Sequence, residues 1–318
     1  MAGRVPAFPG SGNRGLKEKN LLDKEYIKLG ISPVNWTNDD MPELGDEISW
    51  EQCVSEAAEA GFAGTEIGHK YPVDWAELKY GMAEKGLVAF NAWMSTYFVS
   101  KPYKDNIKAF RMFLDKMKYL GASTVMVSEQ GNSIQARDIP VISPQKPVFT
   151  LDELAIVAKG YDEMGHIALN DGIYLTVHHH MGTAVETLVE IDQLMDRTSP
   201  DRVFLLFDSA HSFFAGDDPE ELLKKYVSRT RVVHAKDIRK NVLAQVEKNG
   251  WSFKKAVLNG IFTVVGDGDI EFEPLFKILS DADYKGWICA EAEQDPAKAN
   301  PLEYAKLGMA KLRELTLL

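Results

Sequence analysis

IYLTVHHH (residues 173–180) and VFLLFDSAH (residues 203–211) are two short apolar runs that end in histidine or aspartate. Both runs are rich in β-branched, leucine and aromatic residues, which is typical of buried strands. Between them, residues 184–196 carry apolar side chains at three- and four-residue spacing, which predicts an amphipathic helix. A strand, a helix and a strand in this order predict two parallel strands joined by a crossover helix.

The same unit recurs along the chain. The other predicted strands are residues 26–32, 65–67, 87–93, 124–128, 232–235 and 287–290. Helical patterns occupy residues 50–60, 106–120 and 151–170, and most helical stretches end at a glycine that suits a left-handed C-cap: Gly61, Gly86, Gly121 and Gly172. About eight such units close a barrel, so we expect an α/β fold, a single-domain (β/α)8 TIM barrel over residues 25–318.

The alternative is an open doubly wound sheet. That fold usually carries GxGxxG after its first strand, but Gly30-Ile31-Ser32-Pro33 stands there instead. Residues 1–24 show no periodicity and are predicted to be a disordered N-terminal tail. Two long stretches, 130–149 and 239–268, exceed a minimal barrel and are expected to be loops that line or cover the site.

The composition argues against nucleic-acid and membrane partners. The chain of 318 residues has a formal net charge of −11 and no run rich in lysine and arginine, so nucleic acid is an unexpected partner. Cys53 and Cys289 are its two cysteines, too few for a disulfide framework or a CxxC zinc site, which favours a cytoplasmic protein. No apolar run approaches the ~18 residues of a membrane span. We therefore expect an enzyme with a small-molecule substrate and no membrane partner.

Polar side chains follow the later predicted strands, where a barrel places its reacting groups. They are His178-His179-His180, Asp208 with His211, His234 with Lys236, and Glu291 with Glu293. Imidazole and carboxylate together suit a divalent ion such as Mn, Co, Zn or Fe. Any one of these segments is more often a turn or a helix cap, but four successive units give matching positions.

The earlier strand ends carry aromatic and acidic residues. Trp36, Glu66, Trp93 and Glu129 occupy these positions and are predicted to bind substrate. An aromatic residue there often plugs the top of a barrel, although a Trp face also packs on a sugar or cyclitol ring.

Several longer strings resemble the inosose dehydratases, within the xylose isomerase-like TIM barrels. They include Trp36-Thr37-Asn38-Asp39-Asp40-Met41-Pro42, His178-His179-His180-Met181-Gly182-Thr183 and Glu291-Ala292-Glu293-Gln294-Asp295-Pro296. The resemblance implies dehydration of 2-keto-myo-inositol (scyllo-inosose) to a trihydroxycyclohexane-1,2-dione, with Mn or Co as the cofactor. The sequence departs from the family where Asp208-Ser209-Ala210-His211 replaces Asp-Thr-Gly-His and where Val265 replaces Pro.

The resemblance also implies a ligand set. Asp208, His234 and Glu291 match the metal ligands of the superfamily, and the fourth ligand, usually Glu, falls on His178. His180 points to the same face of the strand, so the sequence does not separate His178 from His180.

A metal at this position would polarise the substrate ketone, so that the adjacent C–H becomes acidic and an enediolate can form. Glu293, His211 or His180 would act as the base, and His211 or Lys236 as the acid that releases the hydroxyl group. Lys236 has an alternative role as a surface residue paired with Asp237.

Other functions use the same groups. An isomerase or epimerase would reprotonate the enediolate, and a 3-keto-glycoside lyase would expel an alkoxide. A metal-free sugar binder and an endonuclease are disfavoured, the first by the four ligand-bearing strand ends and the second by the charge. A homo-oligomer is expected only by analogy with other barrels of this class.

Overall fold

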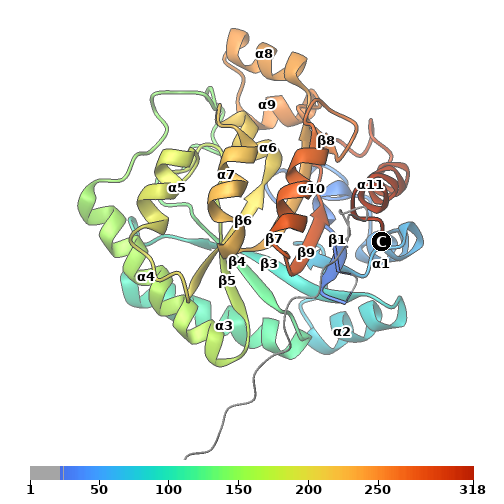
Figure 1. The fold of residues 1–318 in the computed structure, drawn as a ribbon, viewed down its shortest axis with the longest axis horizontal. Coiled ribbons are helices and arrows are strands. Elements are labelled where there is room, and N and C mark those ends of the chain that lie inside the picture. Colours follow the sequence, from blue (N-terminus) through green and yellow to red (C-terminus); the bar gives the residue numbers. More distant parts are fainter. Residues whose placement is uncertain (1–21, 24) are drawn as a thin grey trace, which may run out of the picture.

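The computed structural model describes residues 22, 23 and 25–318. Its centre is a ring of eight parallel strands (Figure 1). The strands of the ring are β1 (Ile27–Ile31), β2 (Gly64–Ile67), β3 (Val88–Thr96), β4 (Thr124–Glu129), β5 (Tyr174–His178), β6 (Val203–Asp208), β7 (Thr230–Ile238) and β9 (Gly286–Ala290). Successive strands pair in parallel, and β9 pairs with both β7 and β1, so the ring closes. The predicted (β/α)8 barrel is confirmed.

Helices surround the ring on its outer side (Figure 1). They are α1 (Trp50–Ala60), α2 (Trp75–Glu84), α3 (Tyr103–Leu120), α4 (Leu151–Asn170), α5 (Leu188–Met195), α6 (Ser209–Phe214), α7 (Pro219–Tyr226), α10 (Phe272–Asp281) and α11 (Pro301–Thr316). Two 3-10 turns, η1 (Pro33–Asn35) and η2 (Val227–Arg229), complete the connections. The described part of the chain contains no helix that is both long and apolar enough to cross a membrane.

Local sequence fixes the helix ends. Thr187 caps α5 and forms a capping box with Glu190, so this helix begins four residues later than its apolar pattern predicts. Gly61 and Gly121 end α1 and α3 with positive φ values of 94° and 83°, as their predicted role as left-handed C-caps requires.

The stretch 239–268 was predicted to be a loop, and the structure corrects this. It contains α8 (Lys240–Asn249), α9 (Phe253–Leu258) and β8 (Phe262–Val264), which pairs antiparallel with the end of β7. α8 buries little apart from Val246. Together these elements form a lobe beside the top of α6 (Figure 1). The other stretch, 130–149, has no helix or strand and leans on this lobe, since Val141 N donates to Trp251 O.

Aromatic side chains fill the barrel interior below the site. Phe90 and Trp287 stack with their ring centroids 4.2 Å apart, and Met126, Leu206 and Cys289 pack with them. This plug leaves the carboxyl ends of the strands as the place where a cavity forms. The predicted tail, residues 1–24, lies outside the described residues except for Leu22 and Asp23.

Candidate metal centre and active site

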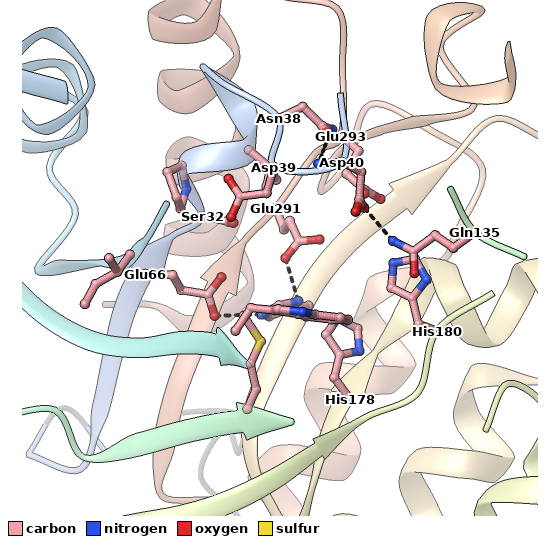
Figure 2. A pocket seen from close by; sticks show the side chains of 16 residues that line it. Ser32, Asn38, Asp39, Asp40, Glu66, Gln135, His178, His180, Glu291 and Glu293 are labelled. Atoms are coloured by element: carbon pink, nitrogen blue, oxygen red, sulfur yellow. Dashed lines mark hydrogen bonds and ion pairs between the residues drawn. The ribbon is translucent and has the colours of Figure 1, made fainter. Parts of the chain in front are cut away.

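A cavity of about 570 Å³ opens at the carboxyl ends of the strands. Figure 2 shows side chains entering it from opposite sides, with Glu66 on one side, Gln135 and His180 on the other, and Glu291 between them. Its floor includes Met126 from the barrel plug. The cavity is therefore the concave, mostly apolar site with a few polar groups that binds small molecules in barrels of this kind.

The four predicted metal ligands lie together: His178, His234 and Glu291 line this cavity, and Asp208 is buried beside them. One ligand atom from each of His178, Asp208, His234 and Glu291 lies within 4.8 Å of every other. His178 Nε2 is 4.0 Å and His234 Nδ1 is 3.6 Å from Asp208 Oδ2. His180, the alternative fourth ligand, instead groups with His211 and Glu293. The geometry therefore favours His178 as the fourth member of the cluster.

The two carboxylate oxygens of Asp208 have different contacts. Oδ1 accepts a hydrogen bond from His211 N and caps α6, which is the ordinary role of an aspartate after a strand. Oδ2 is buried and has no hydrogen-bond partner among the described residues, although it faces His178 and His234. The ammonium group of Lys236 lies 3.3 Å from this oxygen, so Asp208 Oδ2 already lies beside one positive charge. With no hydrogen bond of its own in the described part of the chain, the oxygen can also ligate a metal ion.

Two imidazoles complete the fit to a metal. Burial and the neighbouring His234 and His211 hold the pKa of His178 well below its usual value, so His178 is neutral as a ligand must be. Burial disfavours a charged His234, but Glu291 and Glu66 outweigh burial and raise its pKa well above the usual value. The same concentration of negative charge favours a cation, and metal binding would displace the proton. The residues present therefore fit a divalent metal ion.

Glu66 orients one of these ligands. Its Oε1 lies 3.0 Å from His234 Nε2 and also accepts a hydrogen bond from Asn91 Nδ2. This contact engages Nε2 and leaves His234 Nδ1 facing Glu291 Oε2, 2.6 Å away. A carboxylate that fixes the far nitrogen of a ligating histidine is a common support of metal sites.

Lys236 lies at the base of the cluster and is completely buried. Its Nζ lies 2.5 Å from Glu291 Oε1, 3.0 Å from Glu293 Oε2 and 3.3 Å from Asp208 Oδ2. Burial alone would lower the pKa of Lys236, but these three carboxylates raise it. The alternative in which Lys236 lies at the surface beside Asp237 is wrong, since Asp237 faces the opposite way and accepts from the backbone of residues 266–270.

The four predicted catalytic residues separate into two pairs. His180 and Glu293 line the cavity, whereas His211 and Lys236 lie beneath its wall and do not line it. His211 Nδ1 bonds the His179 carbonyl oxygen, so Nδ1 carries the proton and Nε2 accepts from Lys236 Nζ at 2.6 Å. In the same way His180 Nδ1 donates to the Met181 carbonyl oxygen.

This arrangement leaves His180 Nε2 as an acceptor. Burial and the nearby His211 lower the pKa of His180 to about 3, so its imidazole is neutral near pH 7. Glu293 is different, because burial is outweighed by Lys236 and His211, which hold its pKa well below the usual range.

The predicted substrate residues divide differently. Glu66 and Trp93 line the cavity, and the Trp93 ring packs edge-on against His178 and His180, with centroids 5.6 and 5.7 Å away. Trp36 and Glu129 do not line it, which corrects their prediction. The Trp36 indole is buried and donates to Glu56, 20 positions later in the sequence. Glu129 turns back to accept from Thr96 Oγ1 and the backbone N–H groups of Phe98 and Gly131.

Several cavity residues were not predicted, and Asn38, Asp40 and Gln135 are among them. Asn38 and Asp40 follow η1, and Gln135 lies in the stretch 130–149. Asn38 and Asp40 belong to the family-like string at residues 36–42, which was a signal for them. Gln135 lies in an irregular loop, where no periodicity predicts the direction of a side chain.

Comparison with known proteins defines the class. Residues 54–315 match the family model of the xylose isomerase-like TIM barrel. The chain has a TM-score of 0.68 with the crystal structure of the IOLI protein with a binding zinc atom, at 14% identity, covering 91% of this chain and 98% of that one. It has a TM-score of 0.66 with the probable 3-DHS dehydratase AsbF from Bacillus anthracis, at 15% identity, covering 90% and 98%. At these identities the two structures show the shared fold.

Closer relatives define the family. The chain is 50% identical over 286 residues to the inosose dehydratase of Bacillus cereus (strain AH820), covering 90% of this chain and 96% of the relative. It is 47% identical over 285 residues to the inosose dehydratase of Clostridium tetani (strain Massachusetts / E88), with the same shares covered. The chain belongs to the inosose dehydratase family.

Proposed function

We propose that this chain is a metal-dependent dehydratase, a hydro-lyase that removes water from 2-keto-myo-inositol in myo-inositol catabolism. The product is a trihydroxycyclohexane-1,2-dione. One observation carries the proposal: in a chain of the inosose dehydratase family, His178, His234 and Glu291 line the cavity and form one cluster with the buried Asp208. A cytoplasmic location is part of the proposal, because Cys53 and Cys289 are buried and unpaired.

His178, Asp208, His234 and Glu291 would hold the metal. A divalent ion bound there supplies a Lewis acid that polarises the substrate ketone. Manganese or cobalt suits this mixture of two imidazoles and two carboxylates. The rest of the chemistry falls to the side chains around the cluster.

His180 is the proposed base. It lines the cavity, and its Nδ1–H is held by the Met181 carbonyl oxygen, so Nε2 is the nitrogen with a free lone pair. Glu293 also lines the cavity, but its Oε2 accepts from Lys236 at 3.0 Å. Burial lowers the pKa of His180 to about 3, so the choice between the two rests on geometry: His180 Nε2 has no hydrogen bond among the described residues, whereas the Glu293 carboxylate is already bound to an ammonium group.

His211 and Lys236 act as positioning residues in this proposal. Lys236 contacts Glu291 of the metal cluster and Glu293 of the neighbouring group that contains His180 and His211. It therefore fixes the positions of these two carboxylates relative to each other. His211 receives one Lys236 N–H bond and packs against the His180 ring, with centroids 4.4 Å apart. Trp93 offers an aromatic surface on which the ring of the substrate can pack.

The test is to load the purified protein with Mn or Co and add 2-keto-myo-inositol. We expect the absorbance of the dione to appear and the mass of the organic product to fall by one water. An epimer of unchanged mass would replace this proposal with an epimerase. No reaction with any keto-cyclitol or keto-sugar would favour a non-catalytic sugar binder.

A further inference from the structure

Dehydration needs a proton donor as well as a base, because hydroxide is a poor leaving group unless it is protonated as it departs. Sequence suggested His211 or Lys236 for this task. Both are buried below the cavity wall, with 1% and 0% of their surface exposed, and both are engaged in the hydrogen bonds described above. Neither side chain is placed to touch a substrate hydroxyl.

Asp40 is a carboxyl group that does face the cavity. It lies at the cavity mouth, where it is exposed to water, on the side where Gln135 and His180 lie (Figure 2). Its position is fixed from two sides. Gln135 Nε2 donates to Asp40 Oδ2 at 2.5 Å, and Asn38 Oδ1 accepts from the backbone N–H of Asp40 at 2.9 Å.

These contacts place the proton of the acid. Because Oδ2 receives the N–H of Gln135, a proton on Asp40 belongs on Oδ1, which has no hydrogen-bond partner in residues 22, 23 and 25–318. The flanking amides each keep one buried polar atom that no described residue satisfies, Asn38 Nδ2 and Gln135 Oε1. An unused donor and an unused acceptor beside Asp40 suit a hydroxyl group, which both accepts and donates.

We propose that Asp40 is the catalytic acid that protonates the departing hydroxyl group of the keto-cyclitol. This inference rests on the proposed function. The base removes the proton from the carbon beside the ketone. The electron pair of that C–H bond forms the new carbon–carbon double bond, and the C–O bond at the next carbon breaks. The departing oxygen takes the proton from Asp40 Oδ1 and leaves as water. The resulting enol loses its O–H proton and gains a proton at the carbon that lost the hydroxyl group, which gives the dione. The base releases its proton to solvent, and Asp40 regains one from solvent at the cavity mouth.

The electrostatic surroundings raise the share of Asp40 that carries a proton. One side of the residue is open to water at the cavity mouth, but the cavity-wall atoms around its carboxyl and the negative charges of Glu293 and Asp39 raise its pKa to about 6, against the opposing effects of Gln135 and Lys236. Arg137, Asp138 and Lys254 line a second hollow that Asp40 also lines. A proton donor is most useful when its pKa lies near the working pH, so a value in this range suits an acid.

The test uses Asp40→Asn, which keeps the size of the side chain and removes the acid. With 2-keto-myo-inositol we expect kcat for water loss to fall by about 10²- to 10⁴-fold. With an analogue in which fluorine replaces the departing hydroxyl, we expect fluoride release within about tenfold of the wild-type rate, since fluoride needs less help from a proton. A residue that only shapes the cavity would slow both eliminations equally.

Asp39→Asn is the matched control. Asp39 also lines the cavity, but its Oδ1 is bonded to His69 Nδ1 at 2.7 Å. We expect this variant to show no difference between the two leaving groups. Asp40→Glu, which restores an acid, should recover part of the water loss.

The proposal is overturned if Asp40→Asn loses water within about tenfold of wild type, or if its fluoride release falls as far as its water loss. Metal content and thermal unfolding of each variant show that the comparison is made on folded, loaded protein. Failure of the wild-type protein to dehydrate the keto-cyclitol would instead refute the proposed function.

Discussion

Carboxylates lie at strand ends both among the late strands (β5, β6, β7 and β9) and among the early strands (β2 and β4) of the barrel, but they are used differently. At the ends of β5, β6, β7 and β9, the polar groups of the cluster contact one another directly. At the ends of β2 and β4, Glu66 supports that cluster, whereas Glu129 turns away to bind the backbone. Thr96 and Phe98, at and just after the end of β3, and Gly131 of the loop after β4 together donate to both oxygens of Glu129. A carboxylate at a strand end therefore serves the site only if neighbouring donors leave one of its oxygens without a hydrogen bond.

The largest expected effect comes from removing a metal ligand at the ends of the late strands. Asp208→Ala or His234→Ala removes one of the four ligands, so we expect the bound metal to be lost and dehydration to fall by more than about 10³-fold, on the scale of metal-assisted catalysis. Elemental analysis of the purified variants measures the metal.

Asp208→Asn serves as a second variant, because Asp208→Ala also removes a partner of the buried Lys236 and so lowers stability. Full metal occupancy in both Asp208→Ala and His234→Ala would refute the ligand assignment.

The next effect tests whether Glu66, at the end of an early strand, supports the metal ligand His234. Glu66→Gln keeps a group that can accept from His234 Nε2 but removes the negative charge. We expect the dissociation constant of the metal to rise about 10- to 100-fold, as for other groups that orient a ligating histidine. Calorimetric titration with Mn or Co measures the change.

Glu129→Gln is the matched control, since the same substitution falls on the neighbouring carboxylate that lies outside the cavity. Equal metal affinity in Glu66→Gln and wild type would mean that Glu66 does not orient His234.

Glu129→Gln has its own expected effect, on stability. The Glu129 carboxylate accepts from Thr96 Oγ1 at 2.9 Å, Phe98 N at 3.0 Å and Gly131 N at 3.1 Å. An amide would direct its own N–H groups at some of these donors, so we expect the free energy of unfolding to fall by about 1–3 kcal/mol. Denaturant unfolding measures this loss, and a variant that keeps its stability but loses metal would place Glu129 in the site after all.

The fold was predictable because its signal is repeated. Eight strand-and-helix units each carry their own apolar pattern, so an error in one unit does not change the barrel. The stretch 239–268 was predicted less well, since it adds two short helices and an antiparallel strand to the barrel unit, and α8 is a mostly exposed helix that depends on the lobe it joins.

The site was predictable where the side-chain direction follows from the strand. His178, Asp208 and His234 lie in β5, β6 and β7, and alternation along a strand limits the direction of each side chain. The choice between His178 and His180 needed coordinates, because His180 lies after the end of β5. Asp40 and Gln135 lie in loops 95 positions apart in sequence, and sequence patterns give no measure of a contact of this kind.

The smallest effect distinguishes the two tryptophans that were both predicted to bind substrate. Trp36 is buried, and its Nε1 donates to Glu56 at 2.6 Å, so Trp36→Phe should cost about 1–2 kcal/mol of stability through the lost hydrogen bond and the smaller ring. Its KM for the keto-cyclitol should match that of wild type. Trp93→Phe reduces the aromatic surface inside the cavity and should raise KM several-fold, because stacking on an aromatic face contributes about 1 kcal/mol. Steady-state kinetics beside thermal unfolding separates the two variants. A raised KM in Trp36→Phe with unchanged stability would show that Trp36 contributes to substrate binding although it lies outside the cavity. The contrast between Trp36 and Trp93 would then no longer hold.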